Sequence, residues 1–295
     1  MKVLVLGAGG QIGREVCRAQ WPPHYTLVPL DRGTIDITKS AFVSAILSRE
    51  RPDLAINLAA YTAVDRAESE PEAAWAVNCA GAAHVAAACD EAATPLIHIS
   101  TDYVFDGHKT EPYREEDPVA PLGVYGCSKE AGERAVRAAL ESHLILRTAW
   151  VYGAYGANFV KTMLRLAAER PLLRVVADQR GCPTSAAEIA TALIVIARYL
   201  ERGDARWGTY HFAGAGAVSW YGFAEAIFDL ATPRLVARPR LVAIGAEQYP
   251  TPARRPMSSV LDCRKIKDVY GIAPPAWQAA LAPVIEQLIN RTHPC

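Results

Sequence analysis

The most constraining feature of the sequence is a glycine-rich stretch at its start. The apolar run KVLVL, residues 2–6, is followed directly by GAGGQIG. A strand, a glycine loop and a helix in this order let a pyrophosphate approach the backbone at the helix N-terminus, because no Cβ intervenes. The bare glycine pattern is weak, and a purely structural turn is the alternative. At this position in the chain we predict dinucleotide binding by Gly7, Gly10, Gln11, Ile12 and Gly13.

Apolar, β-branched runs alternate with alanine-rich segments of helical period along the first half of the chain. LAINLA precedes PEAAWAVNCAGAAHVAAACDEA, and PLIHIS precedes YGCSKEAGERAVRAAL. This alternation is typical of a parallel sheet covered on both faces. We expect a doubly wound, Rossmann-like α/β fold with a smaller, partly interleaved C-terminal α/β domain, and GTYHFAG as a strand returning to the sheet. The predicted dinucleotide-binding domain comprises residues 1–149 and 184–214, and the smaller domain comprises residues 150–183 and 215–295.

Charge and cysteine content narrow the class of partner. Basic and acidic residues number 31 each, so we expect a small-molecule ligand and neither nucleic acid nor a membrane surface. The N-terminal apolar run is too short for a secretory signal, and later runs such as TALIVIARYL are too short to span a bilayer. The seven cysteines are odd in number and include no CxxC pair. This pattern predicts a cytoplasmic protein without a disulfide framework or a zinc site.

Two charged residues end the second predicted strand, YTLVPLDR. An acid at this position favours NAD by accepting hydrogen bonds from the adenosine ribose, whereas an arginine pairs with the extra phosphate of NADP. Asp31 and Arg32 are both present, so the cofactor preference stays open, and a solvated charge pair is the alternative. Asp36 and Ile37 are predicted at the adenine edge, although Asp36 or Thr38 is equally suited to capping a helix.

Hydroxyl side chains end the fourth predicted strand, in IHISTDYVFDG. Open α/β sheets bind their ligands at the carboxyl ends of the strands, although such hydroxyls often serve only as caps. Further along, VYGCSK begins a helix and places Tyr125 and Lys129 one turn apart. An ordinary Tyr and Lys at this spacing is common by chance. A lysine ammonium and a nicotinamide cation would together lower the phenol pKa by about three units, roughly 4 kcal/mol, and so activate it for proton transfer.

With the glycine loop, these residues predict a catalytic set of Thr101, Tyr125 and Lys129. Lys129 is expected to hydrogen-bond the nicotinamide ribose, and Thr101 to donate to the substrate oxygen.

The ordered motifs GAGGQIG, NLAAYTAVDRAESEPEAAWAVN, STDYVFDG, VYGCSK, RTAWVYG, DQRGCPT and YPTPARRPMSSVLD resemble the extended short-chain dehydrogenase/reductase family, over essentially the whole chain. The resemblance is closest to the branch of that family that reduces dTDP-4-dehydrorhamnose. It implies NADPH or NADH as cofactor, and reduction of the C4 ketone of dTDP-4-dehydro-β-L-rhamnose in the last step of dTDP-L-rhamnose synthesis. The smaller domain would then bind the sugar nucleotide.

The resemblance also implies site residues at matching positions. Those that would pass the cofactor are Ala59, Ala60, Tyr61 and Thr62, together with Tyr125 and Lys129. Those that would face the substrate are Val64, Asp65, Glu68, Thr101, Asp102, Tyr125, Trp150, Asn158 and Arg255, with Gln179 and Pro183 in neighbouring motifs. Packing at a domain junction is the alternative for Trp150, and Arg254 shares the suggested diphosphate role of Arg255.

The sequence departs from some members of the family that dimerise through a magnesium ion. Its segment WQAALAPVIEQLI has Glu286 as its single acid, so we predict no metal site, with Glu15 and Glu188 as helix-surface residues, and a monomer or a homodimer. Two other functions stay open. One is a 4,6-dehydratase or an epimerase of the same superfamily. A dehydratase would add acid/base carboxylates beside the threonine, typically an Asp-Glu pair, whereas here Asp102 is followed by Tyr103. A non-catalytic nucleotide-binding subunit, like the β subunit of methionine adenosyltransferase, would leave the same residues idle.

Overall fold

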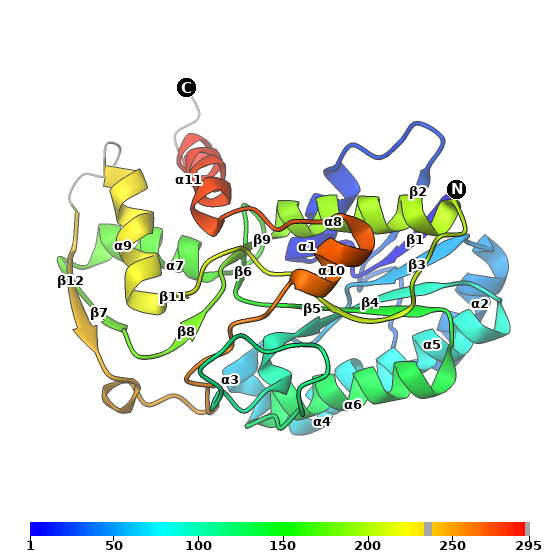
Figure 1. Ribbon diagram of the computed structural model, residues 1–295, viewed down its shortest axis with the longest axis horizontal. Coiled ribbons are helices and arrows are strands. Elements are labelled where there is room, and N and C mark those ends of the chain that lie inside the picture. Colours follow the sequence, from blue (N-terminus) through cyan, green and yellow to red (C-terminus); the bar gives the residue numbers. More distant parts are fainter. Residues whose placement is uncertain (233–237, 293–295) are drawn as a thin grey trace.

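Six parallel strands form the main sheet, in the order β10-β5-β4-β3-β1-β2 (Figure 1). They are β1 (Lys2–Leu6), β2 (Thr26–Leu30), β3 (Leu54–Asn57), β4 (Leu96–Thr101), β5 (His143–Thr148) and β10 (Gly208–His211). All residues of β3, β4 and β5 are buried because both faces of the sheet are covered. β1 pairs with both β2 and β3, so the strand order reverses beside it. Open α/β sheets bind ligands at such a point.

Helices cover the two faces of this sheet as separate layers (Figure 1). Helices α1 (Gln11–Arg18), α8 (Ala186–Glu201) and α10 (Arg264–Tyr270) pack over one face. Helices α2 (Ser40–Glu50), α5 (Ala82–Glu91) and α6 (Val124–Ala139) pack over the other. The predicted doubly wound fold is confirmed, and the predicted return of GTYHFAG to the sheet is confirmed as β10 beside β5.

The long helix predicted over residues 71–92 is continuous over residues 71–91 but contains a π-helical segment. It consists of α4 (Pro71–Trp75), η1 (Ala76–Gly81) and α5. The side-chain amide of Asn78 lies at the centre of the segment, where it accepts from the Tyr61 backbone N–H at 2.8 Å and donates to the Tyr61 carbonyl and the Ser128 hydroxyl. Gly81 leaves no room for a Cβ, which would lie 2.7 Å from Ile37. Such π segments are frequent at functional sites.

A second hydrophobic core lies away from the main sheet (Figure 1). It is built from α7 (Phe159–Glu169), α9 (Trp220–Ala231), α11 (Trp277–Thr292) and the parallel pair β7 (Leu172–Val176) and β12 (Arg240–Ile244). Short strand pairs join this core to the rest: β6 (Val151–Tyr152) with β9 (Thr184–Ser185), and β8 (Arg180–Gly181) with β11 (Val218–Ser219). The predicted division into two domains stays a proposal. Helix α10, which that division assigned to the smaller domain, packs on the main sheet.

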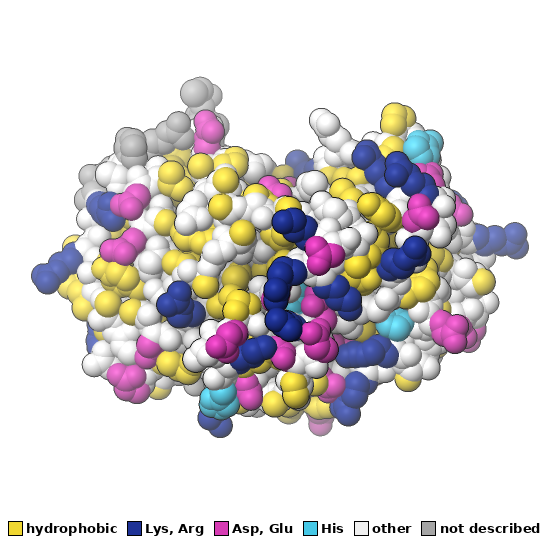
Figure 2. All heavy atoms as spheres, in the orientation of Figure 1, with side chains coloured by type: hydrophobic (Ala, Val, Ile, Leu, Met, Phe, Trp, Pro, Cys, Tyr) yellow, Lys and Arg dark blue, Asp and Glu magenta, His cyan; other side chains and the backbone are white. Residues whose placement is uncertain are grey.

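The computed structural model describes residues 1–232 and 238–292, and Cys295 lies outside these ranges. The remaining short elements are α3 (Val64–Ala67) and the 3₁₀ turns η2 (Asp102–Val104) and η4 (Ala246–Gln248). Within the described ranges, none of the helices has both the length and the apolar character needed to cross a bilayer. On the face seen in Figure 2, basic and acidic side chains are interspersed, in keeping with the predicted small-molecule partner.

Candidate active site

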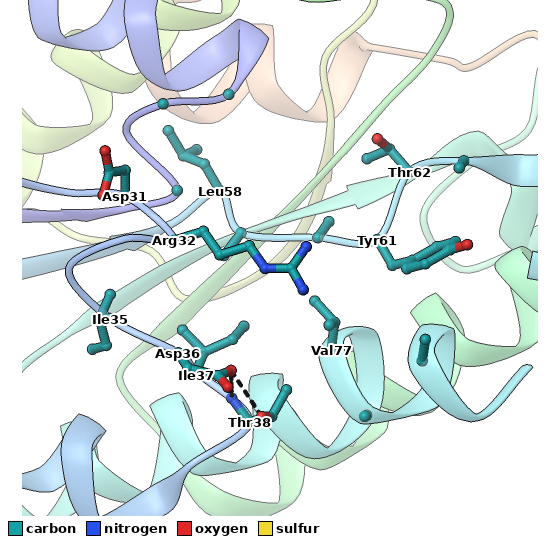
Figure 3. A pocket seen from close by; sticks show the side chains of 18 of the residues that line it. Asp31, Arg32, Ile35, Asp36, Ile37, Thr38, Leu58, Tyr61, Thr62 and Val77 are labelled. Carbon is teal, nitrogen blue, oxygen red and sulfur yellow. Dashed lines mark hydrogen bonds between the residues drawn. The ribbon is translucent and has the colours of Figure 1, made fainter. Parts of the chain in front are cut away.

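A cavity of about 870 Å³ lies at the carboxyl ends of β1, β2 and β3 (Figure 3). Its walls come from the loops that follow these strands and from the π segment of the long helix. The predicted cofactor residues that line it are Gly7, Gly10, Asp31, Arg32, Asp36, Ile37, Ala59, Ala60, Tyr61 and Thr62. Sequence reasoning missed other lining residues, including Arg66, Glu70, Ala73, Ala76 and Val77. They lie within the motif NLAAYTAVDRAESEPEAAWAVN, from which only residues 59–62, Val64, Asp65 and Glu68 were assigned to the site, and the π segment brings Ala76 and Val77 to the cavity.

Two glycines of the loop are required by close backbone contacts. Gly7 has φ +81°, and a Cβ there would lie 2.6 Å from the backbone nitrogen of Ala59. A Cβ at Gly13 would lie 2.3 Å from the Gly7 carbonyl oxygen. Gly10 precedes the first turn of α1 as its N-cap, so the free N–H groups of that turn face the loop. The loop is therefore a bare backbone cradle that fits a dinucleotide pyrophosphate.

The side chain of Gln11, a predicted cofactor residue, points away from this cradle. Its amide donates to the Val151 carbonyl at 3.1 Å and accepts from Asn158 at 2.6 Å. Asn158 also caps α7 by accepting from the Lys161 backbone N–H. Ile12 packs against the main core. Any cofactor contact of Gln11 and Ile12 therefore belongs to their backbone, and Asn158 joins the two parts of the chain instead of presenting a free amide to a substrate.

Thr101 and Asp102 form a buried pair at the end of β4. The Thr101 hydroxyl donates to Asp102 Oδ1 at 3.0 Å and accepts from the Tyr103 backbone N–H at 3.2 Å. Oδ2 of Asp102 has no hydrogen-bond partner among the described residues. Burial raises the pKa of Asp102 to about 7, although the nearby hydroxyls of Ser259 and Thr101 lower it. Sequence reasoning placed Asp102 on the substrate side but did not foresee its coupling to Thr101.

Tyr125 lies beside Thr101, in the first turn of α6. Burial raises the pKa of the phenol to about 12, while the Thr101 hydroxyl next to it acts in the opposite direction. The ring meets that of Tyr103 edge-on, with centroids 5.9 Å apart. Among the protein's own groups, the charge of Asp102 adds to this rise. Tyr125 is therefore a protonated phenol at neutral pH. The lowering expected from Lys129 together with a nicotinamide cation stays a prediction.

Lys129 lies one turn further along α6, and its side chain is buried. Its ammonium donates to the backbone carbonyl of Ile99 in β4 at 2.6 Å. Burial lowers the pKa of Lys129 to about 8, and the carboxylate of Glu133 partly opposes this shift. The structure thus brings Thr101, Tyr125 and Lys129 to one place, at the end of β4 and the start of α6. Glu133, which the sequence analysis did not single out, raises the pKa of Lys129.

Three predicted substrate residues are engaged by other parts of the chain. Asp65 pairs with Arg255, with 2.8 Å between Oδ2 and Nη2. Glu68 accepts from the Val124 backbone N–H at 2.8 Å and so caps α6 just before Tyr125. Arg255 is therefore not a free diphosphate ligand. Val64, Glu68, Arg254 and Tyr125 line a narrow recess together.

Trp150 has a left-handed backbone with φ +44° and stacks on Trp220, with ring centroids 3.4 Å apart. Gly181 passes so close that a Cβ there would lie 2.3 Å from the indole. The packing that the sequence left as an alternative is therefore present. A strained backbone at a non-glycine residue is also frequent at functional sites, so both roles are compatible with the geometry. Among the described residues, no group of three or more His, Cys, Asp or Glu side chains is arranged to hold a metal ion.

The chain matches the family described as the RmlD substrate binding domain over residues 1–290. It is 46% identical over 284 residues to a dTDP-4-dehydrorhamnose reductase of Aggregatibacter actinomycetemcomitans, with 95% of this chain and 97% of the relative covered. A reductase of the same name from Sinorhizobium fredii is 44% identical over 292 residues, with 98% of each chain covered.

Solved structures agree with these relatives. The dTDP-4-dehydrorhamnose reductase of Bacillus anthracis, in complex with NADP, matches with a TM-score of 0.90 and 36% identity, covering 97% of this chain and 99% of that one. A dTDP-glucose 4,6-dehydratase of Streptomyces venezuelae matches with a TM-score of 0.77 at 18% identity over 99% of this chain and 98% of that one, which shows a shared fold alone. The chain therefore belongs to the RmlD family, together with the dTDP-4-dehydrorhamnose reductases.

Proposed function

We propose that this protein is an NAD(P)H-dependent reductase that converts dTDP-4-dehydro-β-L-rhamnose to dTDP-β-L-rhamnose. The observation that carries the proposal is the buried set of Thr101, Tyr125 and Lys129 at the strand end next to the glycine cradle. Its full-length relatives named dTDP-4-dehydrorhamnose reductase support the same activity. A retained and ordered set of this kind favours catalysis over a non-catalytic nucleotide-binding subunit.

The residues of the large cavity fit a nicotinamide dinucleotide. Gly7, Gly10 and the first turn of α1 would hold the pyrophosphate, and residues 31–37 the adenosine end. The segment of residues 59–62 would pass toward the nicotinamide. When bound, the reduced ring supplies the hydride.

In the proposed mechanism, Tyr125 is the acid. Its phenol keeps its proton at neutral pH, because burial raises its pKa to about 12. It is therefore ready to protonate the C4 oxygen as that oxygen becomes an alkoxide, which is a stronger base than a phenolate. The positive charge of Lys129, one turn away, stabilises the phenolate that remains. The expected role of Lys129 at the nicotinamide ribose stays a prediction.

Thr101 orients the reacting oxygen in this scheme. Its hydroxyl lies beside Tyr125 and donates to Asp102. To donate to the substrate oxygen, it has to turn away from Asp102, and protonation of Asp102 would favour that turn because a neutral carboxyl is a weaker acceptor. Trp150, beside Trp220 at the junction, is proposed to contact the sugar.

The activity is tested by supplying purified protein with the dTDP-4-ketosugar and following the absorbance of reduced nicotinamide. The proposal expects consumption of NADPH or NADH coupled to formation of dTDP-L-rhamnose. Binding of cofactor without consumption would contradict it and favour the regulatory-subunit alternative. A cytoplasmic location and a monomeric or homodimeric state remain further proposals.

A further inference from the structure

The backbone of Tyr103 joins the strand end that carries Thr101 to the helix turn that carries Tyr125. Its N–H donates to the Thr101 hydroxyl at 3.2 Å. Its carbonyl oxygen lies against the first turn of α6, where a Cβ on Gly126 would lie only 2.3 Å away. Gly126 directly follows Tyr125, and only glycine allows this close approach of the two backbones. Tyr103 therefore sets how closely Thr101 and Tyr125 approach each other.

The side chain of Tyr103 packs directly on the ring of Tyr125. The rings meet edge-on, with centroids 5.9 Å apart and planes at 76°. This arrangement is favourable because the positive edge of one ring meets the negative face of the other. Both residues line the narrow recess that also contains Glu68 and Arg254. Turning the Tyr125 ring out of this arrangement gives up the contact, so Tyr103 restricts the direction in which the Tyr125 hydroxyl points.

The hydroxyl of Tyr103 lies beside the ion pair of Asp65 and Arg255. Burial lowers the pKa of Arg255, but the adjacent oxygens of Asp65 and Tyr103 raise it above its ordinary value. Burial also raises the pKa of Tyr103, and the charge of Asp102 adds to this rise, so this phenol is protonated at neutral pH. Tyr103 thus contacts the catalytic set with its ring, and the loop that carries Arg255 with its hydroxyl.

We propose that Tyr103 is a positioning residue, whose ring holds Tyr125 at the angle needed for proton transfer and whose hydroxyl couples that geometry to the loop of residues 250–256. The inference rests on the proposed function and deepens it by naming the residue that orients the acid. Tyr103 is not itself the acid, since the Thr101 hydroxyl lies next to the phenol of Tyr125, whereas the phenol of Tyr103 lies beside Arg255. A misplacement of about 1 Å can slow a reaction about a hundredfold, so a displaced ring lowers kcat.

Two variants separate the ring of Tyr103 from its hydroxyl in steady-state kinetics. Tyr103→Leu removes both and is expected to lower kcat about tenfold or more. Tyr103→Phe keeps the ring, so its kcat should stay within about threefold of wild type while KM for the sugar nucleotide rises several-fold. Tyr113→Leu is the matched control, because it removes a ring stacked on Phe105, at 4.2 Å between centroids, that does not line the recess. It should cost stability and leave kcat unchanged.

A second measurement reports the position of the acid without turnover. Fluorotyrosine is incorporated in place of Tyr125, and its fluorine resonance is recorded in the presence of Tyr103, Tyr103→Phe and Tyr103→Leu. The resonance is expected to shift and broaden in Tyr103→Leu and to stay close to that of the unsubstituted protein in Tyr103→Phe, because only the leucine variant removes the ring contact.

A kcat of Tyr103→Leu close to that of wild type would overturn the inference. An equal fall of kcat in Tyr103→Phe would also overturn it, since the effect would then belong to the hydroxyl, and so would an equal fall in Tyr113→Leu. An unchanged fluorine resonance in Tyr103→Leu would overturn it whether or not the ketosugar is reduced. If the resonance shifts as expected but wild type reduces no ketosugar, the proposed function fails while the positioning of Tyr125 by Tyr103 stands.

Discussion

Asp65 and Arg255, which are 190 positions apart, form an ion pair of 2.8 Å at the junction of α3 with the loop before α10. The backbone N–H of Ala253 also donates to Asp65, at 3.3 Å. Both side chains are partly exposed, so the pair contributes little to global stability, below about 1 kcal/mol. Its consequence is local, because it ties the loop of residues 250–256 to α3, which lies between the cofactor cavity and the recess beside Tyr125.

We therefore expect Asp65→Ala to raise KM for the sugar nucleotide about tenfold while kcat changes less than about threefold. Arg255→Ala should do the same, and the double variant should be little worse than either one, because the two residues act through one contact. Steady-state kinetics of the three variants measure this. Multiplying effects would show that Asp65 and Arg255 act on the substrate independently.

Glu133 and Arg147 form a buried pair behind Lys129. Two hydrogen bonds of 2.8 and 2.7 Å join them, and Glu133 is 0% and Arg147 2% exposed. Glu133→Gln leaves the buried guanidinium uncompensated, so it is expected to lower the free energy of unfolding by about 3–5 kcal/mol in urea titrations. Arg137→Gln, which removes only the outer partner of Glu133, should cost less than about 1 kcal/mol. Equal losses would contradict a special role for the inner pair.

The same variant tests the link to Lys129. The pKa of Lys129 is lowered to about 8 by burial and held up by Glu133. Loss of the carboxylate removes the raising influence, so the lysine loses its proton at lower pH. If its charge supports catalysis, the fall of kcat on the alkaline side should begin at lower pH in Glu133→Gln than in wild type. An unchanged pH profile in a folded variant would separate Lys129 from the rate.

Asp102 predicts a pH dependence of stability. Its pKa in the fold is about 7, whereas its ordinary value is 3.8. Between these values the folded state holds a proton that the unfolded state has lost, so its contribution to stability is present at low pH and declines as pH rises through 7. Asp102→Asn is expected to remove this decline. The free energy of unfolding of the variant, compared with that of wild type, should therefore be about 1–3 kcal/mol more favourable at pH 8 than it is at pH 5. Asp36→Asn is the control, because its lowered pKa leaves this range untouched. A wild-type slope retained in Asp102→Asn would refute the assignment.

Gly181 tests whether Trp150 contacts the sugar or only packs. Gly181→Ala places a methyl group 2.3 Å from the indole and displaces it from Trp220. We expect a stability loss of about 1–3 kcal/mol, a changed tryptophan emission and a several-fold increase in KM for the sugar nucleotide. Gly203→Ala adds a methyl group at a positive φ in open space, so it should cost stability without changing KM. An unchanged KM in Gly181→Ala would leave Trp150 with a packing role alone.

The main sheet and the cofactor cavity could be predicted from local sequence patterns. Gly13 is required by its contact with the Gly7 carbonyl six positions earlier, and the hydrophobic period alone separates β1 from α1. The spacing of Tyr125 and Lys129 is likewise a property of one helix turn. Features that depend on residues close in sequence were therefore open to prediction.

Contacts between residues far apart in the chain leave no comparable pattern in the sequence. Gln11 meets Asn158 across 147 positions, and Asp65 meets Arg255 across 190. Several amide or charged residues of the chain would suit each of these side chains as a partner. Their actual partners could therefore not be predicted, and the side chains were expected to bind ligands. The raised pKa of Tyr125 escaped prediction for a similar reason, because desolvation depends on everything packed around the phenol.

Replacement of Tyr125 by phenylalanine is the most direct test of the account. The oxidation of NADPH and NADH by the dTDP-4-ketosugar is followed for wild type and Tyr125→Phe, with cofactor affinity measured on the same samples as a control for folding. The account predicts that kcat falls about a hundredfold or more while cofactor affinity changes little, because only the acid is lost. Turnover close to that of wild type would show that the proton comes from another group and would contradict the proposed mechanism.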